Sequence, residues 1–516
     1  MSEEYLVGLD VGTTLAKSLI FDLEGKIVGY GDREYDVIFP KIGWVETDLE
    51  EIWEKTIAAI REAIKSMKIN PRDIKGISVT NQRQTVAPVD KNGNPLRKAF
   101  SWQDQRAIRE IEWITNRIDK TELFQITGLP PGQWYPITKI LWSKRRQPKI
   151  YEHSYKWLCV HDWIIWKLSG VFATDWSNAS ETMIFDINKL DWSDKLLDLY
   201  KIDRDKLPEA RPPGTLIGEI TETASKLTGL KKGTPVILGA GDQQCSALGV
   251  GNVLPGRFSM CSGTSLVCEA YLEKPVFDRN MLCLTSCHAV PGKYVLEVGN
   301  TACGIIYKWF RDNFGYAETE VARNLGKSVY QLLDDEASKI PPGSEGLVVY
   351  SYFLGDPGFP YFTSRERGVI MGLLTKHTKS HLARALMEGI AYKARHAIDS
   401  VEKVVGRKIR EVRHVGGGAK SKLWNSIYAD VCGVRIAIPE VTESGALGAA
   451  ILAGIGCKIY DDIEAITDRL VKMKYTIEPN IKNRDIYDKI YSKVYIHAYD
   501  RIAEFNRELA RMFTIT

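Results

Sequence analysis

A glycine turn between two apolar runs near the start of the chain constrains the fold most strongly. The apolar run Tyr5–Val11 leads into Gly12-Thr13-Thr14, and a second apolar run follows and ends at Asp22. Two apolar runs of strand length that flank a glycine turn predict a β-hairpin. We therefore expect the chain to open with the first two strands of a sheet.

The turn also has the chemistry of a phosphate-binding site. Gly12 lets the backbone approach an anion closely, and the hydroxyls of Thr13 and Thr14 can reach phosphate oxygens, as can Lys17. Asp10 can hold Mg²⁺, which prefers carboxylate and phosphate oxygen. Short motifs recur by accident, so an ordinary hairpin that carries an Asp is an alternative that this string alone does not exclude.

Length and charge define the broad class of protein. The chain has 516 residues, more than the roughly 250–300 at which a single core stops growing, so we expect two domains. A net charge of +4 is nearly neutral for this length, and Lys and Arg are interleaved with Asp and Glu throughout. This pattern predicts a solvated surface of mixed charge, with no nucleic-acid partner and no membrane partner.

The cysteines and the first residues of the chain bear on where in the cell the protein is found. Nine cysteines, an odd number, form no paired CxxC clusters and predict buried reduced thiols. Cys283 and Cys287-His288 approach a metal motif most closely, but no second cluster partners them, so we expect no zinc site. The acidic start followed by a strand is neither a signal nor a transit peptide, and no apolar run reaches the ~18 residues of a membrane span. We expect a cytoplasmic protein.

Two polar stretches in the first half suggest a pocket for a polyhydroxyl ligand. Asn81–Gln84 follows the predicted strand Ile74–Thr80, where a strand of an α/β sheet opens onto a crevice. Phe100–Arg106 places an aromatic residue beside several hydrogen-bonding groups, which suits the C–H faces and hydroxyls of such a ligand. A solvated loop is an equally good interpretation of the first stretch alone.

A carboxylate on a strand-to-helix turn is the candidate catalytic group. Thr234–Ala240 is predicted as a buried strand that ends in Gly241-Asp242-Gln243-Gln244, and Cys245–Leu248 is predicted to open a short helix. The glycine-flanked position favours a chemical role for the Asp242 side chain over a role in packing. Acids in such places are also found solvated or as helix caps, so both interpretations stay open.

The second half of the sequence repeats the strand–turn–strand pattern of the first half. Strand, Gly263-Thr264 turn and strand recur within Arg257–Val267, which suggests duplicated domains, 1–248 and 249–516, that face each other across a cleft. Later, Glu411–Val415 leads into Gly416-Gly417-Gly418-Ala419 and a helix, a unit that can cradle a nucleotide because glycines admit the ligand and a helix start favours anions. It is neither a Walker sequence nor a GxGxxG fingerprint, and a plain β-α turn is the alternative.

These motifs, in this order, resemble those of the FGGY family of carbohydrate kinases, to which glycerol kinase, xylulokinase and autoinducer-2 kinase belong. Gly8–Thr14 is similar to the family's first phosphate loop and 241–244 to its catalytic turn. In the second half, 262–265 is similar to its second phosphate loop and 416–419 to its adenosine loop. The similarity covers Tyr5 to Asp462. It implies an α/β fold of two actin-like, ribonuclease-H-like domains across a nucleotide-binding cleft, and it leaves a homodimer open.

The resemblance also implies a chemistry and a set of roles. The donor is ATP with Mg²⁺, the reaction is phosphoryl transfer to an alcohol, Asp242 is the base and Asp10 holds the metal. The residues implied to contact the nucleotide are Gly12, Thr13, Thr14, Lys17, Gly263, Thr264, Gly417, Gly418 and Ala419. The residues implied to contact the acceptor are Arg83, Gln84, Trp102, Asp104, Tyr135, Asp242 and Gln243.

Two other classes compete with the kinase. An actin-like or chaperone-type ATPase would not need the polar groups at Arg83-Gln84 and Trp102–Asp104, and the presence of Asp10 and Asp242 disfavours a catalytically silent binding protein. For the acceptor, we expect glycerol slightly ahead of a pentulose such as xylulose or ribulose, or of an autoinducer-2-type substrate. Glycerol kinases place Glu where this chain has Gln84, and because Gln both donates and accepts, that difference bears directly on the choice.

Overall fold

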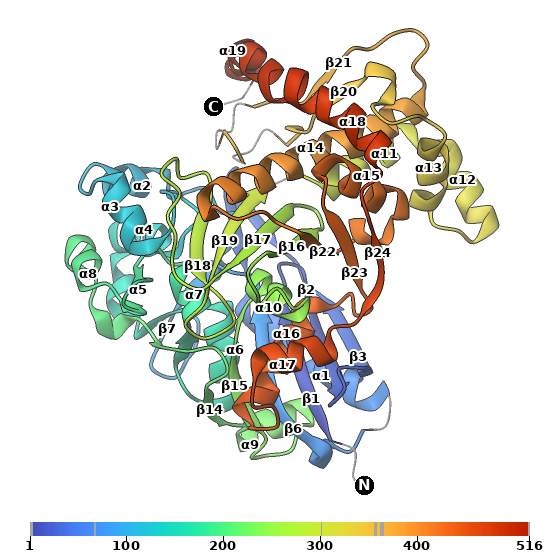
Figure 1. Cartoon of the computed structure of the whole chain (residues 1–516). Helices are drawn as coiled ribbons and strands as arrows, with labels where there is room; N and C mark the ends of the chain where they lie inside the picture. Colours follow the sequence, from blue (N-terminus) through green and yellow to red (C-terminus); the bar gives the residue numbers. More distant parts are fainter. Residues whose placement is uncertain (1–3, 67–68, 301, 355–358, 362–365, 514–516) are drawn as a thin grey trace. The chain divides into compact units, whose positions relative to one another are not determined.

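The computed structural model describes residues 4–66, 69–300, 302–354, 359–361 and 366–513, and its elements are drawn in Figure 1. The chain forms two compact units. Unit 1 comprises Met1–Pro255, Tyr271–Leu296 and Glu443–Lys472, and unit 2 comprises Gly256–Ala270, Glu297–Thr442 and Met473–Thr516. The division 1–248 and 249–516 stays a prediction about domains. By contact, the late segment Glu443–Lys472 belongs with unit 1.

Unit 1 is built on a six-stranded sheet. Its order is β14 (Leu216–Glu219), β15 (Pro235–Gly241), β6 (Ile74–Asn81), β1 (Tyr5–Val11), β2 (Leu15–Asp22) and β3 (Ile27–Glu34). β1, β2 and β3 pair antiparallel, whereas β6 and β15 run parallel to β1. The predicted opening hairpin is therefore confirmed, and the carboxyl ends of three parallel strands meet at one edge of the sheet.

The period of two along β1 assigns its side chains to two faces. Val7, Leu9 and Val11 belong to a core with helices α1 (Leu49–Ser66) and α6 (Val160–Ser169). Gly8, on the other face, meets α16 (Ser444–Gly456), where a Cβ on Gly8 would lie 1.9 Å from the carbonyl oxygen of Ala446. α16 is rich in Gly and Ala, and these small residues allow the helix to pack closely on the sheet.

A second sheet of unit 1 supports the loops that follow it in sequence. Its order is β4 (Ile38–Lys41), β5 (Trp44–Thr47), β8 (Ala99–Phe100), β7 (Val86–Val89) and β9 (Lys156–Cys159). Smaller pairs join β10 (Ala173–Asp175) to β13 (Glu209–Arg211) and β11 (Phe185–Asp186) to β12 (Asp191–Trp192), and β18 spans Leu284–Cys287. The remaining α-helices of unit 1 are α2 (Ile108–Thr115), α3 (Lys120–Thr127), α4 (Pro136–Arg146), α5 (Pro148–His153), α7 (Trp176–Ser180), α8 (Asp194–Tyr200), α9 (Glu222–Thr228), α10 (Asp242–Gly249) and α17 (Ile463–Leu470).

Unit 2 repeats the strand–turn–strand opening. Its strands follow the order β19 (Tyr294–Asn300), β17 (Leu266–Leu272), β16 (Arg257–Ser262), β22 (Glu411–Val415), β23 (Arg435–Pro439) and β24 (Met473–Ile477). β16 and β17 form the antiparallel hairpin, and β22 runs parallel to β16. Its α-helices are α11 (Gly304–Phe314), α12 (Tyr316–Leu325), α13 (Val329–Ser338), α14 (Lys379–Val405), α15 (Lys422–Cys432), α18 (Ile481–Ile490) and α19 (Ile496–Phe513), and a separate strand pair joins β20 (Val348–Tyr350) to β21 (Val369–Met371).

Two local expectations are corrected. The helix expected at Cys245–Leu248 begins three residues earlier, at Asp242, because Gly241 already serves as its N-cap. The stretch Leu207–Gly218 is rich in Pro and Gly, a composition that by itself predicts a loop, but it contains β13 and part of β14. Those strands form because they pair with β10 and β15, partners that local composition does not reveal.

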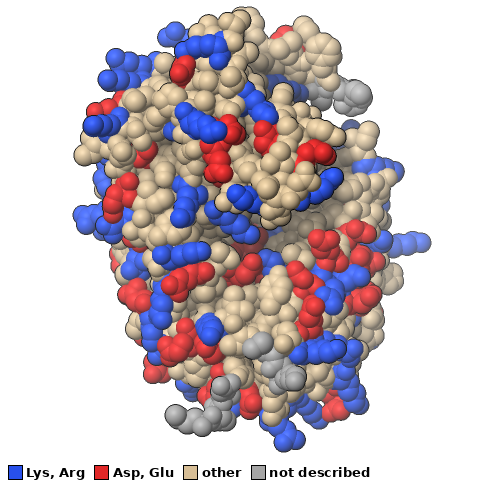
Figure 2. Space-filling view, turned by 90° about the vertical axis from the view of Figure 1, so that its right-hand side faces the viewer, with Lys and Arg blue, Asp and Glu red and all other residues tan. Residues whose placement is uncertain are grey.

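The surface carries charges of both signs, and six of the nine cysteines are buried while Cys261, Cys432 and Cys457 are half-buried. On the face drawn in Figure 2, positive and negative side chains are interspersed. No helix in the part of the chain that the structure describes combines the length and hydropathy needed to cross a bilayer. The nine cysteines are free, and in the described residues no three His, Cys, Asp or Glu side chains are grouped to hold a metal ion.

Candidate active site

The first glycine turn is held by its own backbone and by tethered side chains. Gly12 N donates to Leu15 O at 3.0 Å, and the hydroxyl of Tyr35 donates to Gly12 O. Lys17 pairs with Asp10 in the strand register, and Lys17 Nζ lies 2.6 Å from Glu443 Oε2. Glu443 stands at the start of α16, so a residue from late in the chain orients the predicted phosphate-binding lysine.

Asp10 lies among one lysine and two further carboxylates. Burial raises its pKa to about 7, Lys17 opposes that rise, and the charges of Asp242 and Glu443 add to it. For Lys17, burial alone would lower the pKa, but the hydrogen bond to Glu443 and the charge of Asp10 raise it. A cation bound nearby would therefore stabilise the ionised form of the Asp10 carboxylate.

Arg83 and Gln84 share one buried anchor. Glu181 Oε1 accepts a hydrogen bond from Arg83 Nη1 at 2.9 Å, and Glu181 Oε2 accepts one from Gln84 Nε2 at 2.7 Å. The Glu181 side chain is fully buried, and Gln84 has a left-handed backbone with φ of 68°. Arg83 Nε lies 3.4 Å from Asp242 Oδ1, so the two predicted groups meet.

Asp242 begins helix α10 directly after the parallel strand β15. Its Oδ1 accepts a hydrogen bond from Gln243 N at 2.8 Å, and 36% of its side chain is exposed. Acidic residues in the first turn of a helix are stabilised by the helix dipole. The carboxylate is therefore positioned by the backbone yet reachable from solvent.

The strand that presents Asp242 is held by buried polar side chains. Gly241 N donates to Ser177 Oγ at 2.9 Å, and Ser177 Oγ donates to a carboxylate oxygen of Asp175. Gly239 N donates to His161 Nε2 at 3.3 Å. The pairing of β15 with β6 shifts register between Ile237 and Ala240, so side chains bind N–H groups next to a break in the ladder.

Trp102 connects the loop after β8 to the first glycine turn. Its indole Nε1 donates to Thr13 Oγ1 at 3.2 Å, and the side chain is 37% exposed. A half-exposed indole beside a phosphate-type turn offers an apolar face to a small ligand. Thr14, next in the turn, is exposed.

Asp104 and Tyr135 lie deeper than expected for ligand-binding groups. Asp104 accepts hydrogen bonds from Arg106 Nε at 2.9 and 2.8 Å and from Val45 N at 2.7 Å, and it is 1% exposed. Tyr135 is 1% exposed, at the N-cap of α4 beside the ring of Trp134. The geometry makes Asp104 a support for the loop that carries Trp102. Contact of either residue with an acceptor stays a prediction.

The two glycine turns of unit 2 are joined through His414. Burial lowers the pKa of His414 to about 4, so its ring is neutral. Asn425 Oδ1 lies 2.7 Å from His414 Nδ1 and accepts a hydrogen bond from it, which leaves Nε2 to accept one from Ser262 Oγ at 2.6 Å. Ser262 precedes the predicted phosphate turn Gly263-Thr264, and that turn is therefore fixed to the end of β22.

The adenosine-type turn needs its glycines for close approach. Gly416 has φ of 91°, and a Cβ on Gly418 would lie 2.3 Å from Ser262 Oγ. Gly417 precedes the short 3₁₀ turn Gly418–Lys420, and Ala419 O accepts from Asn425 Nδ2 at 2.8 Å. Within unit 2, the predicted groups Gly263, Thr264 and 417–419 thus belong to one connected structure.

Several residues of the site were missed by the sequence reasoning. Glu181, Glu443, Ser177 and His161 hold predicted residues in place, yet none stands in a recognisable motif. The Asp175-x-Ser177-Asn178 spacing is a capping pattern that could have flagged Ser177, since Asp175 caps α7. The other three had no local signal.

Two units, each with a glycine-turn hairpin, and in unit 1 a carboxylate base candidate whose charge acts on Asp10 are features of the class of nucleotide-dependent phosphotransferases. The chain belongs to the FGGY family of carbohydrate kinases, whose N-terminal domain model matches residues 5–249 and whose C-terminal domain model matches residues 258–457. The protein is an ATP-dependent kinase of sugars or polyols.

Named relatives differ in substrate. The chain is 34% identical over 488 residues to a glycerol kinase of Thermococcus kodakarensis, covering 93% of this chain and 94% of that one. It is 32% identical over 499 residues to an autoinducer-2 kinase of Yersinia enterocolitica, covering 94% and 92%. Its structure is similar to that of a ligand-bound xylulose kinase from Lactobacillus acidophilus, with a TM-score of 0.89, 26% identity and coverage of 98% and 100%.

Proposed function

We propose that the protein transfers the γ-phosphoryl group of ATP to a hydroxyl of a small polyol or ketose, with Asp242 as general base. The observation that carries the proposal is the joint anchoring around Glu181. Both Arg83 and Gln84 bind that buried carboxylate, and Arg83 Nε lies 3.4 Å from Asp242 Oδ1. A reachable base beside two rigidly held polar side chains is suited to orient an alcohol for attack.

The base step follows from the position of Asp242. The acceptor hydroxyl donates its hydrogen bond to the carboxylate, and its oxygen forms the new O–P bond as the bond from the γ-phosphorus to its bridging oxygen breaks. The proton passes to Asp242 as the new bond forms, so a weak base in the right position suffices. ADP and the phosphorylated acceptor are the products.

Asp10 suits a magnesium ion. It is a half-buried carboxylate whose pKa burial raises to about 7, with Asp242 and Glu443 adding negative charge. Magnesium usually binds through one or two carboxylates, several waters and substrate phosphates, which matches a site with few protein ligands. When bound, the ion would neutralise charge on the phosphate oxygens.

The remaining predicted nucleotide contacts take complementary roles. Thr13, Thr14 and Lys17 would bind phosphate oxygens from unit 1, where Glu443 Oε2 lies 2.6 Å from Lys17 Nζ. Gly263 and Thr264 would do so from unit 2, where 417–419 would lie along the nucleoside. Backbone N–H groups of such glycine turns bind anions without a side chain.

For the acceptor, we favour glycerol over a ketopentose. Gln84 donates an amide hydrogen to Glu181, which leaves its carbonyl oxygen to accept from a substrate hydroxyl, as a Glu at this position would. Ketose-type acceptors are the second candidate, because relatives named autoinducer-2 kinase and xylulose kinase match nearly the whole chain.

An ADP-release screen over glycerol, erythritol, xylulose, ribulose and the autoinducer-2 precursor tests the choice through kcat/KM. We expect glycerol to give the highest value. A kcat/KM for glycerol about tenfold below that of a ketopentose, a difference of about 1.4 kcal/mol, would refute the leading choice. Absence of turnover with every acceptor would refute the proposed function itself.

A further inference from the structure

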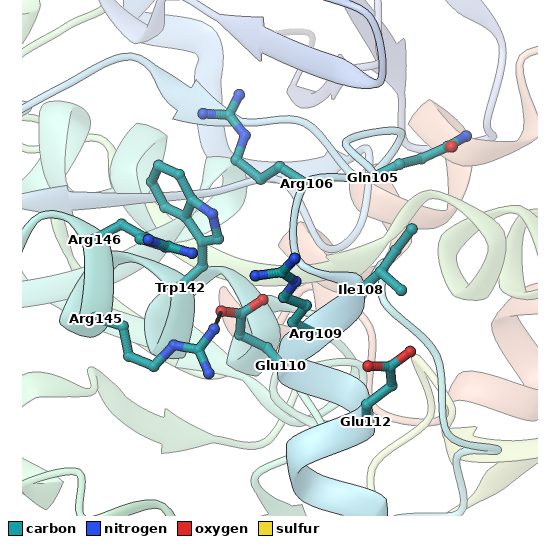
Figure 3. Close-up of a pocket in the computed structure, with 9 residues that line it drawn as sticks. All are labelled: Gln105, Arg106, Ile108, Arg109, Glu110, Glu112, Trp142, Arg145 and Arg146. Carbon is teal, nitrogen blue, oxygen red and sulfur yellow. Dashed lines mark ion pairs between the residues drawn. The ribbon is translucent and has the colours of Figure 1, made fainter. Parts of the chain in front are cut away.

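A hollow in unit 1 is lined by arginine side chains that the proposed chemistry does not use. It lies between α2 and the last turn of α4, with a volume of about 420 Å³. Figure 3 shows the guanidinium groups of Arg109, Arg145 and Arg146 around Glu110 and the ring of Trp142. A hollow of this size can hold a small molecule.

The arginines outnumber the acids that face them. Arg145 Nη2 pairs with Glu110 Oε1 at 2.6 Å, and the Glu110 side chain is 1% exposed. Among the residues that the structure describes, Arg109 and Arg146 form no ion pair within 4.0 Å. Burial raises the pKa of Glu110, while the charges of Arg145, Arg146 and Arg109 lower it, so all three cations act on one carboxylate. The side chains that line the hollow therefore carry more positive than negative charge.

Neighbouring groups do not cancel this excess. Glu112 also lines the hollow, but Figure 3 shows its carboxylate on the side of Ile108, with no ion pair to an arginine. Arg106 is balanced elsewhere, since its guanidinium pairs with Asp104 and Glu46. The eight-residue helix α2 begins at the hollow, and its N-cap Ala107 supplies no side-chain hydrogen bond to the first turn. The positive end of its dipole therefore adds to the field of the arginines.

We propose that this hollow binds a phosphate dianion, either free phosphate or the phosphate of a small monoester, with Arg109 and Arg146 as its ligands. The planar guanidinium donates two parallel hydrogen bonds to phosphate oxygens, which an ammonium cannot do. Trp142 forms the apolar wall, and it is 9% exposed. The site adjoins the loop that carries Trp102 but contains none of the residues proposed to bind nucleotide or acceptor. Only the choice of a polyol phosphate as the organic ligand rests on the proposed function.

Isothermal titration calorimetry of the full chain tests the site, with inorganic phosphate and glycerol 3-phosphate in separate arms. A non-hydrolysable ATP analogue with magnesium occupies the nucleotide site throughout. We expect one saturable site per chain whose Kd rises with salt, and a Kd about tenfold or more higher in Arg109→Gln/Arg146→Gln. The matched pair Arg117→Gln/Arg323→Gln removes the same charge from exposed positions and should leave Kd within about twofold.

Each outcome decides the proposal. Binding of free phosphate alone, of the ester alone or of both, lost in the first pair only, supports the site and identifies its source. No saturable binding of either anion up to about 10 mM, or equal weakening in both variant pairs, overturns it. Because the titration needs no turnover, a protein that binds the anion but phosphorylates no acceptor would refute the proposed function and leave this site standing.

Discussion

Replacement of Asp10 by Asn should stabilise the ligand-free protein at neutral pH while removing its activity. Burial raises the pKa of Asp10 from 3.8 to about 7, so the folded state binds its proton more tightly than the unfolded state does. The associated stability is fully present below about pH 4 and is lost as the pH rises to about 7. At about 1.4 kcal/mol per pH unit, the full loss is about 4 kcal/mol, and we expect about 2–4 because part of the side chain reaches solvent.

The Asn side chain of the variant cannot ionise, so this loss of stability with rising pH should be absent in the variant. In a unit of this size, about 1 kcal/mol moves Tm by roughly 2–4 °C. We therefore expect Asp10→Asn to melt several degrees above the wild type at pH 8, a smaller gain at pH 5, and turnover near zero because the proposed metal ligand is lost. The measurement is thermal unfolding across pH without nucleotide or magnesium, with Asp198→Asn, an exposed aspartate, as control.

The reasoning fails if Asp10→Asn is destabilised at pH 8, or if its stability relative to the wild type is the same at pH 5 and pH 8. Either result would mean that the charge of Asp10 is already compensated in the ligand-free protein. An equal gain in Asp198→Asn would trace the effect to net charge and not to this site.

Three further variants probe the same unit. Asp242→Asn should keep ATP binding by calorimetry and lower kcat by roughly 10²–10⁴, and turnover near the wild-type rate would remove Asp242 from the role of base. Glu181→Gln should raise the acceptor KM by about tenfold with the ATP KM unchanged, because Arg83 loses its charged partner, and an unchanged acceptor KM would contradict the anchoring role. Ser177→Ala leaves the buried Gly241 N–H without its acceptor and should lower kcat by about tenfold while both KM values hold, and a KM effect alone would point to another role.

The sequence by itself determined the local pieces of this protein. The hairpin at Gly12, its counterpart at Gly263 and the strand-to-helix turn at Asp242 depend on strand periodicity and turn chemistry, which act between near neighbours. The order of these motifs along the chain was enough to indicate the family, and the family models match both halves.

Only the tertiary structure decided how these pieces are held. Glu181 binds Gln84 across 97 residues of sequence, and Glu443 binds Lys17 across 426. The residues next to an isolated Glu in sequence look the same whether the Glu lies on a solvated helix or anchors another side chain. Neither Glu181 nor Glu443 could therefore be singled out from the sequence. Asp104, which the resemblance placed at the acceptor, accepts hydrogen bonds from Arg106 and Val45, while its contact with an acceptor stays a prediction. Local sequence determines the turns and the buried face of each element. Packing determines which distant side chains pair with a buried charge, because such a pair becomes strong only when water is excluded from it.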